Sequence, residues 1–198
     1  MMTITLEVVK QLREKTGAGV ANCKEALEES GGDLNKAIDV LRKKGIDTAR
    51  KKIGRVTKEG CIESYIHPGN KIGVMIEINC ETDFVARNED FRKFVKDLLL
   101  QITASNPLYI SKKDVPEDLI NKEKEMLSAQ IKDKPANVVE KIVSGRLEKF
   151  YQDICLLEQP FVKDPSITVN SYLTSIIART GENMIIRRFI RYQLGEET

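Results

Sequence analysis

Asn79-Cys80-Glu81-Thr82-Asp83-Phe84-Val85 is the stretch around which we expect the rest of the fold to be arranged. Directly before it, residues 71–78 form an apolar run rich in β-branched side chains, which predicts a strand. After it, apolar residues recur at helical spacing and predict an amphipathic helix: Phe91, Phe94, Val95, Leu98, Leu99 and Ile102. The quoted stretch is therefore predicted to form a strand-to-helix corner.

The residues of this corner have distinct predicted roles. Thr82 is a candidate N-cap, because its hydroxyl oxygen can accept a hydrogen bond from an N–H group of the first helical turn. Asp83 then lies in that first turn, where the helix dipole favours a carboxylate. Phe84 leaves two alternatives open: the ring folds back under the sheet, or it is exposed as an aromatic anchor for a partner's pocket.

The composition is that of a globular protein. Charged residues make up 31% of the 198 residues and hydrophobic residues 41%, with a net charge of +2, which excludes a disordered or strongly basic chain. The length suffices for one ordinary domain and a smaller one. Because no apolar run approaches bilayer length and no signal-peptide core begins the chain, we expect a cytoplasmic protein without a membrane partner.

Candidate catalytic and metal-binding residues are few. The four cysteines are far apart and His67 is the single histidine, so we expect reduced thiols, no metal and no cofactor. His67 has no identifiable carboxylate to orient it as a base. Cys80 is the best candidate nucleophile, but Glu81 and Asp83 beside it are expected to raise the pKa of its thiol. Phosphate-loop and dinucleotide motifs are absent, and we predict that the chain is not an enzyme.

Residues 1–52 predict a domain of three short helices joined by glycine turns. Glycines 17 and 19 end the first helix, glycines 31 and 32 end the second, and the third is predicted to end at Gly45. Apolar residues face inward in each helix: Val8, Val9 and Leu12; Val20, Cys23, Ala26 and Leu27; Leu34, Ala37, Ile38 and Leu41. Such a bundle resembles a ubiquitin-associated domain, whose surface is more often a docking face than a catalytic one.

A basic segment follows the bundle. Residues 42–58 carry eight basic residues and one acidic residue, a pattern that can neutralise phosphates in a nucleic-acid-binding arm. We favour a solvated helix end and linker without direct nucleic-acid contact, because no aromatic residue is interleaved and the rest of the chain compensates the charge. Nucleic-acid binding by this segment and an adaptor role of the bundle alone are the alternative functions.

Residues 53–198 predict an α+β core domain. Strands at residues 61–66 and 71–79 are joined by a turn at residues 67–70, whose proline and glycine are typical of turns. Residues 184–192 predict a third strand that completes a three-stranded antiparallel sheet.

Helices fill the rest of the core domain. One is predicted to start at Pro116 and another to run from about residue 136 to residue 151, with a break at residues 132–135, which together form an antiparallel helical hairpin. Residues 160–165 predict a loop, and residues 168–178 another helix.

Two long stretches in the right order are similar to elongation factor Ts. They are residues 12–20 followed by residues 23–27, and residues 77–87. The resemblance continues through residues 155–161 and 187–192, so that it covers essentially the whole chain. In length and in having a single core unit, the chain resembles the short bacterial form of the family.

The resemblance implies a guanine-nucleotide exchange factor for elongation factor Tu, the GTPase that carries aminoacyl-tRNA. By residue match, the corner that is wedged beside the nucleotide consists of Thr82, Asp83, Phe84 and Val85. The resemblance also implies that the N-terminal bundle docks on the GTPase through Arg13, Gly19 and Val20, and that the chain forms a homodimer through its sheet.

Overall fold

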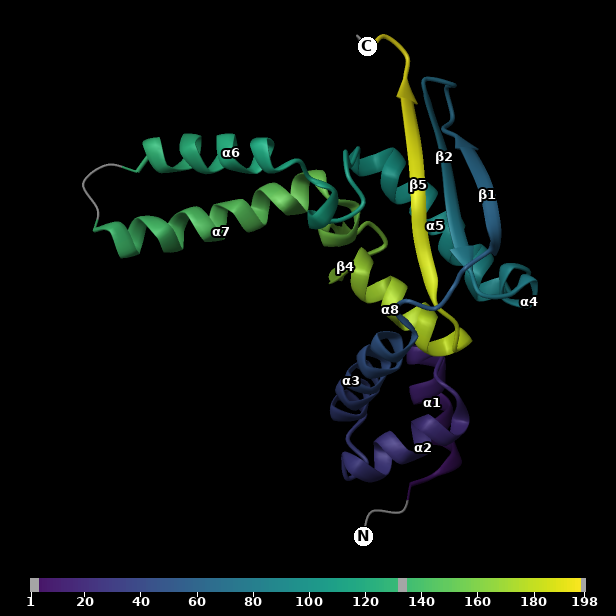
Figure 1. Cartoon of the computed structure of the whole chain (residues 1–198). Helices are drawn as coiled ribbons and strands as arrows, with labels where there is room; N and C mark the ends of the chain where they lie inside the picture. The colour runs from purple at the N-terminus through teal and green to yellow at the C-terminus, as the bar shows by residue number, and fades with distance from the viewer. Residues whose placement is uncertain (1–3, 132–134, 197–198) are drawn as a thin grey trace. The chain divides into compact units, whose positions relative to one another are not determined.

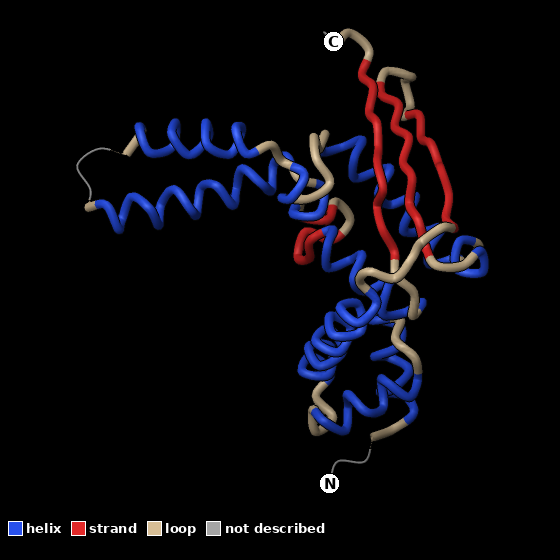
Figure 2. Tube along the Cα trace, viewed as in Figure 1, coloured by secondary structure: helices blue, strands red, loops and turns tan. Residues whose placement is uncertain are grey.

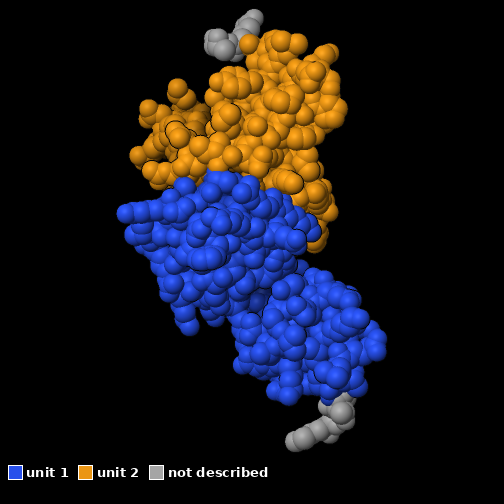
Figure 3. Space-filling view, turned by 90° about the vertical axis from the view of Figure 1, so that its right-hand side faces the viewer, with its two compact units in different colours: residues 1–61, 78–94, 173–185 blue, residues 62–77, 95–172, 186–198 orange. Residues whose placement is uncertain are grey.

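A computed structural model describes residues 4–131 and 135–196 of the chain. The fold is α+β, as predicted, with a three-stranded antiparallel sheet in the order β1-β2-β5 and a two-stranded sheet of β3 and β4 (Figures 1 and 2). The chain forms two compact units, shown in Figure 3. Unit 1 comprises residues 1–61, 78–94 and 173–185, and unit 2 comprises residues 62–77, 95–172 and 186–198. The predicted domain boundary at residue 52 stays a prediction.

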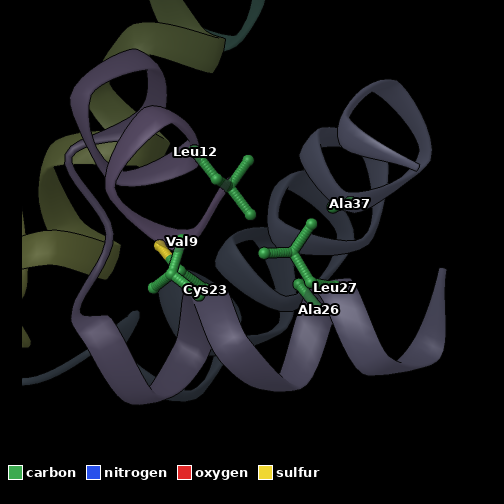
Figure 4. Packing of buried hydrophobic residues seen from close by; sticks show 6 residues of the cluster. All are labelled: Val9, Leu12, Cys23, Ala26, Leu27 and Ala37. Atoms are coloured by element: carbon green, nitrogen blue, oxygen red, sulfur yellow. The ribbon is translucent and has the colours of Figure 1, made fainter. Parts of the chain in front are cut away.

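Three helices form the N-terminal part of unit 1: α1 (Leu6–Thr16), α2 (Val20–Glu29) and α3 (Leu34–Lys52). Gly17 ends α1 in the left-handed region at φ 66°, and its N–H donates to Arg13 O. The helices enclose a small core, in which Figure 4 shows the buried side chains Val9, Leu12, Cys23, Ala26, Leu27 and Ala37. Val20 does not join this core, contrary to the sequence prediction, because it begins α2 and is 52% exposed.

The third helix is longer than predicted. It continues through Gly45 to Lys52, so most of the basic segment is helical surface and not linker. A glycine inside a helix costs about 1 kcal/mol relative to alanine, which packing of the following turns can offset. Ala49 is buried in those turns, and a Cβ at Gly45 would lie 3.4 Å from the Cβ of Ala178, so Gly45 lies at a close helix contact.

The predicted helix after the corner is broken in two. The one-turn helix α4 (Asp83–Ala86) is followed by α5 (Glu89–Ser105). Asn88 Oδ1 accepts from Asp90 N at 2.7 Å, which starts α5 anew, and Arg92 Nε donates to the Ala86 carbonyl at the end of α4 at 2.9 Å. The residues predicted as the apolar face of the helix are all buried in α5: Phe91, Phe94, Val95, Leu98, Leu99 and Ile102.

The strands of the larger sheet are β1 (Glu59–Ile66), β2 (Ile72–Cys80) and β5 (Met184–Gln193). The predicted turn between β1 and β2 is confirmed: His67 N donates to Ile72 O and Asn70 N to His67 O, each at 2.9 Å. Along β2, buried side chains alternate with more exposed ones, so one side of the sheet faces a core: Val74, Ile76, Ile78 and Cys80 are buried.

Unit 2 also contains the predicted helical hairpin, α6 (Glu117–Ala129) and α7 (Ala136–Ile154), which pack against each other (Figure 1). Of the predicted break at residues 132–135, residues 132–134 lie outside the described residues. Two short 3-10 helices occupy Lys112–Asp114 and Leu156–Glu158. No helix in the described part of the chain is long and apolar enough to span a bilayer.

The predicted loop at residues 160–165 is wrong in part. It forms the short antiparallel pair β3 (Pro160–Phe161) and β4 (Asp164–Thr168), and helix α8 (Val169–Thr180) follows. The buried Gln101 stabilises this turn, because its Oε1 accepts from Val162 N at 2.7 Å and its Nε2 donates to Pro160 O at 3.2 Å. A long-range contact of this kind leaves no local sequence pattern.

Candidate partner-binding site

The corner between β2 and α5 exposes one large apolar side chain. Phe84 is 80% exposed, whereas Ala86 in the same turn is buried. The ring therefore does not fold back under the sheet, which excludes one of the two alternatives left open by the sequence, and the role of the ring as a partner's anchor stays a prediction. An exposed aromatic ring beside carboxylates has the character of a binding anchor, since such rings fill pockets in partner proteins.

Thr82 caps α4 as predicted, because its Oγ1 accepts from Val85 N at 3.4 Å. Two further contacts, those made by its N–H and its hydroxyl hydrogen, go to a residue that the sequence did not indicate. The Thr82 N–H donates to Glu182 Oε2 at 3.0 Å, and the Thr82 hydroxyl donates to Glu182 Oε1 at 2.6 Å. The N–H and the hydroxyl of Thr82 are thus each held by a carboxylate oxygen of Glu182.

A second carboxylate, that of Glu81, accepts from the residue that follows Glu182. Glu81 Oε1 accepts from Asn183 N at 2.6 Å, and Glu81 Oε2 lies 3.5 Å from Arg55 Nη1. The side chain of Asn183, a residue only 3% exposed, donates to Arg55 O at 3.0 Å. The Asn183 N–H and the Arg55 guanidinium lower the pKa of Glu81, because both interactions favour its charged form.

Asp83 lies in the first turn of α4, as predicted, and forms an ion pair with Arg87 at 2.9 Å. A pair of this spacing on an exposed helix contributes at most about 0.5 kcal/mol to stability. Both side chains remain substantially exposed to solvent. Val85 is half-buried, and its N–H donates the capping bond to Thr82 in the turn that carries the Phe84 ring.

Cys80 is unsuited to nucleophilic chemistry. Burial raises the pKa of its thiol to about 11, with a further contribution from the charge of Glu182. The direction is the predicted one, but the cause is not, since we expected Glu81 and Asp83 to act on the thiol. His67 is exposed at the hairpin turn, and its Nδ1 lies 3.3 Å from the Tyr65 hydroxyl. Within the described residues, no group of three His, Cys, Asp or Glu side chains could hold a metal ion.

The predicted docking residues Arg13, Gly19 and Val20 flank the turn between α1 and α2, and all three are exposed. Open space surrounds Gly19, where a Cβ would meet no atom within 4 Å. Arg179 of α8 supports the same turn. Its guanidinium donates to Thr16 O at 3.0 Å and to Asp90 Oδ1 at 3.1 Å, and it lies so close to Gly17 that a Cβ there would overlap it.

Both predicted binding positions belong to unit 1, which contains residues 1–61 together with the corner and the second half of α8. Within unit 1, Arg179 contacts both the end of α1 and Asp90, which lies at the start of α5 shortly after the corner. The turn between α1 and α2 and the Phe84 corner are thus parts of one compact body.

A different exposed surface lies on the sheet in unit 2. Two observations show which residues of neighbouring strands share one side of this sheet. A Cβ at Gly73 would lie 3.0 Å from Ile66 Cδ1, and Arg188 Nε donates to Glu77 Oε2 at 2.7 Å. Side chains alternate along a strand, which places Ile62, Ile66 and Met75 on this side. In β5, Met184 and Ile186 are buried, and the alternating exposure from Arg188 onward adds Ile190 and Tyr192. We call this the open sheet face, and its members are 44–66% exposed: Ile62, Ile66, Met75, Ile190 and Tyr192.

These features define an α+β protein that presents an aromatic ring at a fixed strand-to-helix corner. The chain belongs to the family Elongation factor TS, whose family model matches residues 2–196 and confirms the predicted resemblance. Elongation factor Ts of Thermodesulfovibrio yellowstonii is 58% identical over 98% of both chains. That of Carboxydothermus hydrogenoformans is 57% identical over 98% of this chain and 90% of the relative. That of Thermotoga petrophila is 52% identical over 98% of both chains.

Proposed function

We propose that the chain is a guanine-nucleotide exchange factor that acts on elongation factor Tu during translation elongation in the cytoplasm, by binding and not as an enzyme. Family membership supports this function, because relatives named Elongation factor Ts match nearly the whole chain. The observation that carries the proposal is the 80% exposure of Phe84 on a corner whose cap, Thr82, is bonded through both its N–H and its hydroxyl.

The corner acts as a wedge beside the nucleotide. A GTPase holds GDP through backbone N–H groups around the phosphates and through Mg²⁺, which tolerates little departure from octahedral oxygen coordination. Insertion of the Phe84 ring displaces the elements that supply these contacts, so GDP is bound less tightly and GTP can replace it. Asp83 supplies directed polar contacts, while Thr82 and Val85 shape the turn.

The turn between α1 and α2 provides a second contact. Arg13, Gly19 and Val20 dock on another helix of the GTPase, and this docking places the wedge at a high effective concentration near the nucleotide site. Exposure of all three residues and the open space around Gly19 support this assignment.

The open sheet face joins two copies of the chain. Its five exposed apolar side chains lie on three neighbouring strands and share this side with the Arg188–Glu77 ion pair, and exposed apolar surface of this kind favours association in water. Contact between two identical faces closes the assembly at a two-fold dimer. We propose a dimer without a disulfide, because no cysteine lies in the strand β5.

Capture of purified elongation factor Tu on the immobilised chain tests the proposed function. The exchange factor and GDP must weaken each other's binding by the same factor, since their coupling is reciprocal. We expect the GTPase to be retained in nucleotide-free buffer and released on addition of GDP. Failure to capture it, or capture that GDP leaves unchanged, contradicts the proposed function.

A further inference from the structure

We infer that Glu182 is a positioning residue for nucleotide exchange. It orients the Phe84 wedge by accepting hydrogen bonds from both donors of Thr82, the N–H and the hydroxyl. This inference rests on the proposed function of the corner. Glu182 lies 100 residues from Thr82 in sequence, and its two carboxylate oxygens accept separately from the Thr82 N–H at 3.0 Å and from the Thr82 hydroxyl at 2.6 Å.

The contact replaces a bond that helices normally form locally. In a capping box, the side chain of the third helical residue reaches back to the N–H of the N-cap residue. The third residue of α4 is Val85, whose side chain has no acceptor. Glu182 supplies the missing acceptor from the loop between α8 and β5, so that the start of α4 depends on a distant part of unit 1.

The position of Glu182 is itself fixed on both sides. Before it, Gly181 adopts a left-handed φ of 73° and ends α8, with its N–H donating to Ile177 O at 2.9 Å. After it, the N–H of the buried Asn183 donates to Glu81, the residue next to Thr82. Two carboxylates therefore connect the two segments reciprocally, Glu182 to Thr82 and Glu81 to Asn183.

This arrangement has a direct consequence for the wedge. Phe84 follows Thr82 by two residues in a helix of one turn, which is too short to hold its own direction. A ring that must displace elements of a partner needs a backbone that does not yield. The carboxylate of Glu182 also fixes the Thr82 hydroxyl hydrogen, so that the oxygen lone pairs face Val85 N, 3.4 Å away.

The test compares Glu182→Gln with a matched change elsewhere. The amide removes the charge and one of the two acceptor oxygens, so one Thr82 donor loses its acceptor and the other keeps only a weaker, neutral one. Asp114 provides the control, because it accepts from both the N–H and the hydroxyl of Ser111, at 2.8 and 2.7 Å, at the start of another short helix in unit 2. Both donors share the oxygen Asp114 Oδ2, so Asp114→Asn removes the charge of a similar contact far from the corner in sequence, while its amide oxygen can still accept both hydrogen bonds.

Stimulated GDP release from elongation factor Tu is measured over a range of factor concentrations. For Glu182→Gln we expect the maximal rate to fall about tenfold, the size typical of losing a charged hydrogen bond, with little change in the half-saturating concentration. Simple destabilisation would instead reduce the active fraction, and more protein would restore the full rate. Asp114→Asn should exchange like the wild type.

The amide proton resonance of Thr82 gives an independent readout. We expect it to move upfield and to exchange faster with solvent in Glu182→Gln, while the resonances of unit 2 stay in place. An unchanged maximal rate, a rate restored by excess protein, or an unchanged Thr82 resonance overturns the inference. A wild-type chain that does not accelerate GDP release overturns the proposed function as well, which separates the two failures.

Discussion

The chain exposes apolar side chains in two places that differ in extent and in how they are held. The Phe84 corner in unit 1 presents a single ring on a one-turn helix whose cap is fixed by a distant carboxylate. The open sheet face in unit 2 presents five side chains on three paired strands. A lone, firmly held ring suits a pocket in a partner that binds and leaves, whereas a broad, regular surface suits a lasting contact with its own copy.

The largest effect is expected on the sheet face. Ile190→Glu places a charge within the proposed dimer contact, and an unpaired buried charge costs about 3–5 kcal/mol. Light scattering under reducing conditions should give twice 22.4 kDa for the wild type and 22.4 kDa for the variant. Ile53→Glu, at an exposed isoleucine in unit 1, is the matched control and should leave the mass unchanged. A wild-type mass of 22.4 kDa at micromolar concentration would refute the dimer.

Phe84→Ala is expected to lower the rate of nucleotide exchange without destabilising the fold. Loss of an anchoring aromatic ring costs about 2 kcal/mol or more of binding, equivalent to roughly thirtyfold. A substitution at an exposed position changes stability by about 0.5 kcal/mol or less, so the melting temperature should stay close to that of the wild type. Leu108→Ala removes an exposed apolar side chain from unit 2 and should leave both quantities unchanged. Parallel losses of activity and melting temperature in Phe84→Ala would contradict the wedge.

Val20→Glu tests whether docking of the α1–α2 turn is distinct from the action of the Phe84 wedge. Val20 is half exposed at the turn between α1 and α2, and a charge there should weaken docking by about 1–2 kcal/mol, or roughly tenfold. We expect the half-saturating concentration in GDP release to rise while the maximal rate is kept. A reduced maximal rate at saturation would mean that this turn does not act as a separate docking contact.

The smallest effect concerns pH. The Asn183 N–H and Arg55 lower the pKa of Glu81 in the folded state below its ordinary 4.5. A lowered folded pKa stabilises the fold above the unfolded pKa, and this contribution is lost as pH falls through the folded value. The difference in melting temperature between the wild type and Glu81→Gln should therefore narrow as pH falls from 6 toward 3. A difference that is constant over this range would rule out the contribution of the charge.

Local patterns predicted most of the elements. The cap at Thr82, the turn at residues 67–70 and the buried face of α5 all follow from the types and spacing of neighbouring residues. The break between α4 and α5 escaped prediction because the apolar spacing of the following helix hides a new start at Asn88. Gly45 predicted a helix end, but tertiary packing carries α3 past it.

The contacts that hold the candidate site were beyond sequence analysis. Glu182 and Asn183 lie about 100 residues from the corner, and nothing near them in the sequence marks them as its partners. Their roles depend on α8 and β5 returning the chain to the end of β2. The one local signal is negative: Val85 stands where a capping box would have a carboxylate or amide.

We propose above that the Phe84 corner promotes release of GDP. It is tested most directly by following a fluorescent GDP analogue as it leaves elongation factor Tu, with and without the wild-type chain and with Phe84→Ala. The wild-type chain should accelerate release in proportion to its concentration until saturation, and Phe84→Ala should lower the saturated rate about thirtyfold. Acceleration by both proteins to the same saturated rate would contradict the account.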